Sequence, residues 1–360
     1  MHRCGHHRPR LAEYRPSALE LEWFEKPAVG KICDLMLQQR AGSSTWLNFS
    51  ETLWRQADPS MTLRGPTEAE KSVLSQFIYE DGSVEYVEPL TGYARYPNGP
   101  IGCKGSDKHA RYKNHTRFQE LFNIRYIVPS STCGLTGDPR VGCYRKARFY
   151  DLGCTTYSGT HREALRALPT QASGLNVGGP SIPLFSEIYR RRCLPFDELY
   201  GWEASKAARF ESSSWYRDVP SDVRPRIHYY NTPVALANNG TDDSIKSALS
   251  IDAADWEQRA NAGDFFGTLL ASASPEDFVV VKLDIEGQSG GPEVAIAEAI
   301  AMRPELVRLV DEFYFEYHFW FDGHNFGWGN VKKEGSPNVD DALDLMRRLR
   351  KAGVRAHFWI

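Results

Sequence analysis

The chain has 360 residues, of which 41% are hydrophobic and 25% are charged, and its formal net charge is −3. These values are typical of a globular protein with one large or two ordinary domains, and they give no electrostatic reason to expect a nucleic-acid partner or an anionic membrane. No apolar stretch approaches the roughly 20 residues that a membrane-spanning helix needs, and the first residues lack the apolar segment of a signal peptide.

The cysteines give a prediction for the compartment. There are 7 of them, scattered without a CxxC pair, and an odd number without metal spacing favours free thiols in a reducing compartment. Three glycosylation sequons begin at Asn48, Asn114 and Asn239, and without a signal sequence we interpret them as chance matches. We therefore expect a cytoplasmic protein, and no feature indicates an obligate protein partner.

Residues 1–145 have a texture of their own, with many Trp, Tyr, Pro and Gly residues and only short helical patterns. A helix is expected over 66–79, because Thr67 and Glu70 form the pattern of a capping box. A second helix is expected over 112–122, and residues 83–97 predict a strand followed by a turn. We interpret 1–145 as a mixed, loop-rich extension that packs on the main domain and can cover its site.

From residue 146 onward, candidate strands and helices alternate. The expected strands are 147–153, 196–203, 226–231, 277–284, 309–319 and 354–360. The expected helices are 161–168, 182–192, 292–302 and 339–353. This alternation predicts an α/β domain over 146–360, with a mainly parallel sheet and helices on both faces. Asn338 is the expected N-cap of the last helix, and Gly353 its expected end.

The segment DFVVVKLDIEG (277–287) places acidic side chains at the end of a buried strand. An apolar run without polar alternation is typical of a strand buried on both faces of a parallel sheet. In open parallel sheets, ligands bind just beyond the carboxyl ends of the strands. Asp284 and Glu286 are therefore expected at the edge of a site.

Two further strand ends carry candidate ligand-binding residues. FYDLGCTTYSG (149–159) predicts a strand, a turn at Gly153 that lets the backbone approach a ligand, and helix amides beyond it. The GxGxxG spacing is absent, because Thr155 stands where a second glycine belongs, and this argues against a dinucleotide pyrophosphate. Glu203 ends the next strand, where it either accepts hydrogen bonds from ribose hydroxyls or is simply a solvated strand end.

The order of the segments DLG, GGPS, FDELYGWE, HYYNTPV, FVVVKLDIEG and LVDEFYFEYHF resembles the FkbM-type family of S-adenosylmethionine-dependent methyltransferases. The branch it is most similar to is the one of uncharacterised eukaryotic, notably algal, proteins. KLDIEG is the most specific element, since it is similar to the family's Lys-x-Asp-x-Glu-Gly signature. The likeness covers residues 151–360 and extends more loosely through 86–97.

The resemblance implies a class I methyltransferase with a Rossmann-like sheet that binds S-adenosylmethionine over its carboxyl edge. The cofactor-binding residues it implies are Asp151, Gly153, Cys154, Thr155, Glu203, Asn231 and Asp284. Of these, the first four border the methionine end, Glu203 holds the ribose hydroxyls, Asn231 lies near the adenine, and Asp284 stands with Glu286 beside the methyl group. Two features depart from the family pattern: the turn is poor in glycine, and the last expected strand is the sixth, so the usual final antiparallel strand is missing or comes from elsewhere.

The strand after KLDIEG supplies candidate catalytic groups. Because side chains alternate along a strand, Glu312, Tyr314, Glu316 and His318 share one face. If this strand lies beside 277–284, Glu316 and His318 approach the acidic end of that strand. The hypothesis is that Asp284, Glu286, Glu316 and His318 line the acceptor site, with His318 or Asp284 as the general base.

Simpler interpretations of these residues stay open. Glu316 and His318 can pair only to satisfy each other, and Lys282 can be a structural counter-ion of Asp284. Carboxylates and an imidazole can also hold a divalent metal, but their spacing matches no specific metal motif, so no metal is expected.

The expected function is methyl transfer to a hydroxyl of a small molecule, a glycan or a lipid head group. One alternative is a non-catalytic cofactor-binding or interaction domain, which the glycine-poor turn favours. Another is a nucleotide-sugar transferase in which Asp284 and Glu286 hold a metal.

Overall fold

The computed structural model describes a little over half of the chain, in segments that include all the elements discussed below. The described residues are 10–25, 35, 38, 45–50, 52, 65–91, 126–128, 144–157, 180–192, 194–206, 210–234, 263–285, 292–317, 320–321, 324–325 and 338–359. Within them, no helix has both the length and the apolar character needed to cross a membrane.

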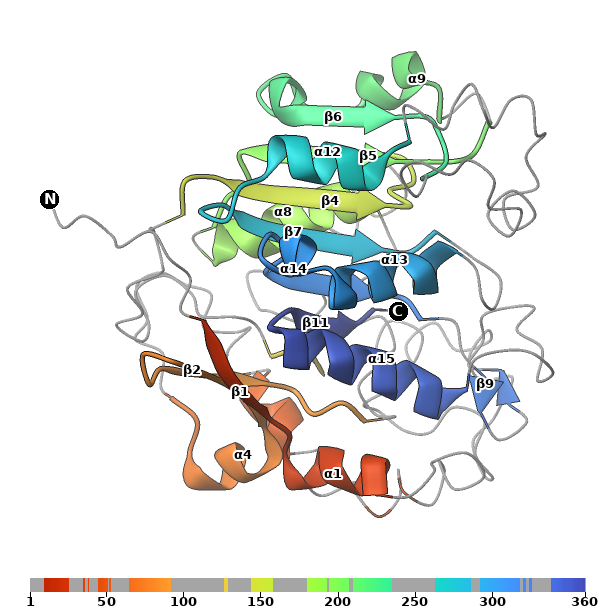
Figure 1. Cartoon of the computed structure of the whole chain (residues 1–360). Helices are drawn as coiled ribbons and strands as arrows, with labels where there is room; N and C mark the ends of the chain where they lie inside the picture. The colour runs from red at the N-terminus through yellow and green to blue at the C-terminus, as the bar shows by residue number, and fades with distance from the viewer. Residues whose placement is uncertain are drawn as a thin grey trace, which may run out of the picture.

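A six-stranded parallel sheet forms the centre of the fold (Figure 1). Its strands, in chain order, are β4 (Ala147–Leu152), β5 (Glu198–Trp202), β6 (Ile227–Tyr230), β7 (Phe278–Leu283), β8 (Glu312–Phe315) and β11 (Arg355–Phe358). Their order in space is β11-β8-β7-β4-β5-β6, and each neighbouring pair is parallel. Counted from β4, this is the doubly wound order 3-2-1-4-5-6, so the predicted parallel α/β sheet is confirmed.

Helices cover both faces of this sheet, as the alternation of strands and helices predicts. The helices are α8 (Ser181–Arg191), α9 (Ser212–Arg217), α12 (Phe265–Ser272), α13 (Pro292–Met302), α14 (Pro304–Val307) and α15 (Val339–Ala352). Phe149 stacks on Phe185 of α8, whereas the neighbouring Tyr150 bonds Ser272 of α12, so these helices lie on opposite faces. Figure 1 shows α12, α13, α14 and α15 together on the face opposite α8.

The strands form where they do because their side chains are buried on both faces. Every residue of β4, β7, β8 and β11 is buried. The strand expected over 309–319 is shorter, since β8 covers only Glu312–Phe315.

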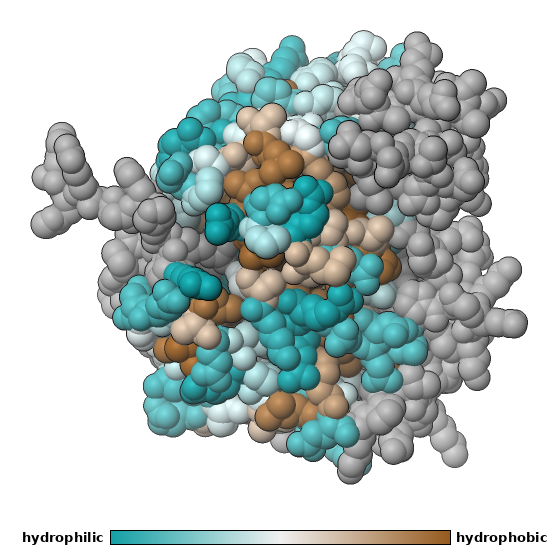
Figure 2. Space-filling view, viewed as in Figure 1, coloured by the Kyte–Doolittle hydropathy of each residue, from teal (hydrophilic) through white to brown (hydrophobic). Residues whose placement is uncertain are grey.

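On the outer side of the helical layer, Figure 2 shows apolar surface around α12. The large exposed apolar side chains of this layer include Leu270 of α12 and Met302 of α13.

The last helix has the caps that the sequence predicts. Asn338 accepts hydrogen bonds from the amides of Asp340 and Asp341, and the side chain of Asp341 accepts one from the Asn338 amide. Gly353 ends the helix with a φ of 104°, a left-handed conformation that glycine adopts without a Cβ penalty.

The N-terminal region forms a second, three-stranded antiparallel sheet in the order β1-β2-β3. It consists of β1 (Leu11–Arg15), α1 (Ala18–Glu25), α4 (Glu68–Val73), β2 (Ser75–Tyr79) and β3 (Val84–Val87). The capping box of Thr67 and Glu70 is confirmed. The helix expected over 66–79 is wrong beyond residue 73, because residues 75–79 alternate in burial and pair with both β1 and β3. The helices expected over 112–122 and 161–168 lie outside the described residues.

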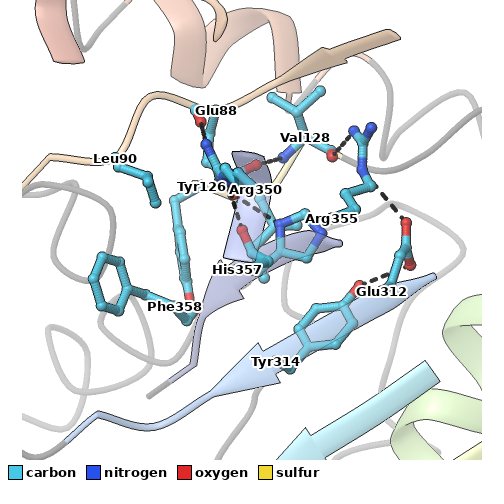
Figure 3. A network of polar contacts seen from close by, with 12 residues as sticks. Glu88, Leu90, Tyr126, Val128, Glu312, Tyr314, Arg350, Arg355, His357 and Phe358 are labelled. Atoms are coloured by element: carbon cyan, nitrogen blue, oxygen red, sulfur yellow. Dashed lines mark hydrogen bonds and ion pairs between the residues drawn. The ribbon is translucent and has the colours of Figure 1, made fainter. Parts of the chain in front are cut away.

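A buried network of charges joins this N-terminal region to the β11 edge of the parallel sheet (Figure 3). Arg350 of α15 donates to the carboxylate of Glu88 at 2.8 Å and to the hydroxyl of Tyr14 at 3.0 Å, and it lies 3.8 Å from Glu20. The ring of His357 on β11 lies 2.7 Å from the same Glu88 carboxylate. Because an unpaired buried charge is costly, the pairs hold the two parts of the chain together.

Strand β11 also makes hydrogen bonds, through a side chain and through its backbone, with residues from much earlier in the chain. Arg355 donates to the carbonyls of Tyr86 and Val128 at 2.6 and 2.8 Å. Tyr126 donates to the carbonyl of Phe358 at 2.7 Å. These contacts bring the described N-terminal residues against the β11 edge.

Two further short strands, β9 (Trp320–Phe321) and β10 (His324–Asn325), pair with each other and are separate from the large sheet.

Candidate functional site at the switch point of the sheet

The strand order reverses between β4 and β7, which makes their carboxyl ends the topological switch point of the sheet. The two strands pair along their whole length, from Ala147 opposite Phe278 to Leu152 opposite Leu283. In doubly wound sheets, ligands bind beyond the carboxyl ends of the strands at this point. The candidate site is therefore the β4–β7 edge, which we define as residues 151–155 and 282–285 with the adjoining ends of β5 and β8.

The turn after β4 is held by backbone contacts to both neighbouring strands. The amides of Gly153 and Cys154 both donate to the carbonyl of Trp202 at 3.0 Å. The φ of Gly153 is 91°, and a Cβ added there would lie 1.7 Å from the carbonyl oxygen of Asp284. Glycine is thus required by the approach of β7, and these two amides are committed to Trp202 and not to a ligand.

Thr155 has a left-handed backbone, with a φ of 51°, although it is not a glycine. Its carbonyl accepts a hydrogen bond from the indole of Trp215 at 2.8 Å, and the Trp215 ring packs edge-on against Tyr157. Non-glycine residues in this conformation are uncommon and persist where surrounding contacts fix them. Trp215 of α9 supplies that contact, and no pattern in the sequence predicts this role.

Asp151 lies beneath the edge, since its side chain is fully buried. Ser181, the first residue of α8, donates its hydroxyl to one carboxylate oxygen, and the ammonium of Lys282 lies 3.4 Å from the other. Burial raises the pKa of Asp151, and the nearby charge of Asp284 adds to this effect, against the opposing influence of Lys282. Asp151 was predicted to border the methionine end of the cofactor. In the structure it lies below the turn and contacts Lys282, which in turn reaches the carbonyl of Gly153.

Lys282 lies between the two strand ends. Its ammonium is 2.8 Å from a carboxylate oxygen of Asp284 and 3.5 Å from the carbonyl oxygen of Gly153. Burial alone lowers the pKa of Lys282, but the charges of Asp151, Asp284 and Glu316 outweigh it and raise the pKa. The side chain is therefore a buried cation, and the counter-ion interpretation of Lys282 and Asp284 matches the observed contact.

Asp284 and Glu316 follow the neighbouring strands β7 and β8, so the condition for their predicted approach is met. The amide of Glu316 donates to the carbonyl of Leu283 at 3.0 Å, directly before Asp284. The Asp284 side chain is 20% exposed, and Glu316 is buried. Glu286 and His318, the other two predicted catalytic residues, lie outside the described residues.

The predicted shared face of the β8 side chains is confirmed for its first two members. Glu312 and Tyr314 both contact the hydroxyl of Tyr189 on α8, the latter at 2.9 Å. Both are buried. They belong to the core beneath α8. Both precede Glu316 in the chain, so they lie within β8 and not at the candidate site beyond its end.

The ends of β5 and β6 complete the edge on its other side. Glu203 is half-buried; its amide donates to the carbonyl of Tyr230, and its carboxylate accepts a hydrogen bond from the amide of Ser205 at 2.8 Å. Burial raises the pKa of the Cys154 thiol, and the charges of Asp151 and Glu203 add to the rise. Glu203 directly follows Trp202, whose carbonyl accepts the hydrogen bonds of the turn amides, so it lies next to the turn. Asn231 follows β6 directly and is half-buried.

A glycine within β5 sets how closely the turn packs. A Cβ on Gly201 would lie 2.9 Å from the sulfur of Cys154 and 3.1 Å from Ile182 of α8. An isolated glycine inside a strand pattern indicates such a close approach, so Gly201 in FDELYGWE is a feature from which this packing could have been predicted.

No protein-family model, curated protein or solved structure matches this chain. The described edge offers one buried cation, Lys282, and carboxylates on three strand ends, at Glu203, Asp284 and Glu316. Among the described residues, no three His, Cys, Asp or Glu side chains are grouped so that they could hold a metal ion.

Proposed function

We propose that the chain is an S-adenosylmethionine-dependent methyltransferase that binds its cofactor over the β4–β7 edge and methylates a hydroxyl. The observation that carries the proposal is the coincidence of the switch point with acidic strand ends. Doubly wound sheets bind nucleosides at this point, and Glu203, Asp284 and Glu316 stand at it. The resemblance of KLDIEG to the FkbM signature adds the sulfonium nucleoside to this general expectation.

The described residues fit this cofactor in their chemistry. Glu203 ends the strand next to β4, where an acidic residue can accept hydrogen bonds from the ribose hydroxyls, and Ser205 fixes its orientation. Asp284 presents a partly exposed carboxylate at the end of β7, on the other side of β4, where it can face a cationic sulfur. When bound, S-adenosylmethionine supplies an electrophilic methyl group.

The side chains at β7 and β8 would then orient the acceptor and remove its proton. An in-line displacement needs the acceptor oxygen held close to the methyl group, and a base should take the hydroxyl proton as the bond forms. Lys282 engages one oxygen of Asp284 at 2.8 Å, so a proton taken by Asp284 must compete with this ion pair. His318 is therefore the favoured base in this proposal, and Glu316 is a further residue proposed to line the acceptor site.

A non-catalytic cofactor-binding domain is the second candidate, and the turn after β4 favours it. The amides of Gly153 and Cys154 both bond Trp202, so this turn has fewer donors for a ligand than the sequence suggested. Such a domain would bind the cofactor product but show no turnover with any acceptor.

Ligand-induced stabilisation tests the proposal directly. S-adenosylhomocysteine should raise the melting temperature of the protein, because a ligand that binds only the folded state stabilises it. A Glu203→Gln variant should lose the shift, and a Glu211→Gln variant, altered at an exposed position before α9, should keep it. Stabilisation by a nucleoside diphosphate with manganese, and none by S-adenosylhomocysteine, would favour the nucleotide-sugar transferase instead.

A further inference from the structure

We infer that Lys282 is the positioning residue of the β4–β7 edge, whose ammonium fixes the carboxylate of Asp284 relative to the turn at Gly153. The inference rests on the proposed function, because that function places Asp284 beside the sulfonium. It adds a role for a residue that would otherwise be only a counter-ion.

The course of the Lys282 side chain is the first argument. In the register of the sheet, its Cα lies opposite that of Asp151. Its ammonium nevertheless reaches the level of the strand ends, 2.8 Å from Asp284 and 3.5 Å from the carbonyl of Gly153. One cation therefore contacts both sides of the switch point at the height where a ligand would bind.

The gradient of burial is the second argument. Asp151 is 0% exposed and Lys282 is 2% exposed, whereas the side chain of Asp284 is 20% exposed. Ser181 holds the far oxygen of Asp151. The chain of contacts from Ser181 through Asp151 and Lys282 thus begins in the core and ends in one partly exposed carboxylate.

Stability alone is a poor explanation for this arrangement. Removing two charges from water costs more than their attraction often returns, and a well-packed apolar pair is frequently as stable or more stable. If Lys282 served only to neutralise the buried Asp151, its shorter contact would be expected there. Instead the ammonium lies 3.4 Å from Asp151 and 2.8 Å from Asp284. What the ion pair provides in addition is a fixed position for the exposed carboxylate.

The first experiment measures the tie in the ligand-free protein. An Asp151→Asn background avoids leaving a buried carboxylate without its cation when Lys282 is removed. In this background, Lys282→Met, Asp284→Asn and the double variant form a mutant cycle, followed by urea unfolding. We expect a coupling of about tenfold in the unfolding equilibrium constant. A coupling of less than about twofold would overturn the inference, whatever the ligand results.

The second experiment compares S-adenosylmethionine, whose sulfur is cationic, with S-adenosylhomocysteine, whose sulfur is neutral. The variant Asp151→Asn with Lys282→Met keeps the formal net charge of the wild type but lacks the tie to Asp284. We expect its affinity for S-adenosylmethionine to fall about tenfold and its affinity for S-adenosylhomocysteine to fall less, so the ratio drops. Asp151→Asn with Lys282→Arg, which keeps a cation, should restore most of the ratio.

The control is Arg350→Met, which removes an equally buried cation at the distant β11 edge. It should lower stability and leave both affinities unchanged. An equal loss for both ligands in the Lys282 variant would reduce the residue to a structural role and overturn the inference. A wild type that binds neither ligand would reject the proposed function, and with it the binding role of Lys282, even if the mutant cycle shows coupling.

Discussion

Replacing Gly153 by alanine tests the packing of the candidate site most sharply without any ligand. The residue has a φ of 91°, and an added Cβ would lie 1.7 Å from the carbonyl oxygen of Asp284 and 2.7 Å from its carbonyl carbon. Both atoms belong to the backbone of the β7 end, so no flexible side chain can move aside. The turn after β4 and the end of β7 must separate to admit the methyl group.

Two contributions set the expected magnitude. The left-handed conformation costs a residue with a Cβ about 1 kcal/mol, and overpacking against a fixed neighbour costs about 1–3 kcal/mol. The sum predicts that Gly153→Ala lowers the free energy of unfolding by about 2–4 kcal/mol.

The assay is urea denaturation of Gly153→Ala beside a matched control, Gly82→Ala. Gly82 has a similar φ of 82°, but an added Cβ there has no atom within 4 Å. The control should lose only the conformational contribution of about 1 kcal/mol. If Gly153→Ala were no less stable than Gly82→Ala, the close approach of β4 and β7 at the candidate site would be refuted.

Two further predictions concern the buried network at the β11 edge. Arg350→Met should cost about 3–5 kcal/mol in urea unfolding, because it leaves the buried Glu88 without its guanidinium, and a loss below about 1 kcal/mol would contradict the network. Burial lowers the pKa of His357 below 6.5, against the opposing charge of Glu88. As the pH falls, the unfolded chain therefore binds a proton at this histidine before the native state does. The contribution of His357 to the free energy of unfolding is fully present above pH 6.5 and is lost as the pH falls toward the lower pKa of the folded state. His357→Gln should weaken this loss between pH 7 and 5, and parallel stability curves for the two proteins would contradict it.

The parallel sheet could be predicted because its signals are local. Segments such as FVVVKL are apolar on both faces, and the last helix carries a cap at Asn338 and a left-handed glycine at its end. The N-terminal sheet could not be predicted in the same way. Its strands β1 and β2 are far apart in the chain, and residues 75–79 continue a helical pattern until pairing with β1 and β3 overrides it.

The sequence predicts which strand ends carry the acidic residues of the candidate site. It does not predict the hydrogen bonds that hold the turn after β4 and the Asp151 side chain in place. Asp284 and Glu316 are expected close together only if their strands are neighbours, and the structure shows that β7 pairs with β8. That the turn amides bond Trp202, and that Asp151 is tied to Ser181, depends on tertiary packing that no spacing reveals. The roles of the edge residues in binding and catalysis remain predictions.

Calorimetric titration of the wild-type protein with S-adenosylhomocysteine tests the central claim most directly, with Glu203→Gln and Glu211→Gln titrated beside it. The proposal predicts saturable binding to the wild type and to Glu211→Gln, and binding weakened about tenfold or more in Glu203→Gln. A wild-type titration that gives only the heat of dilution would contradict the assignment of the β4–β7 edge to a sulfonium nucleoside.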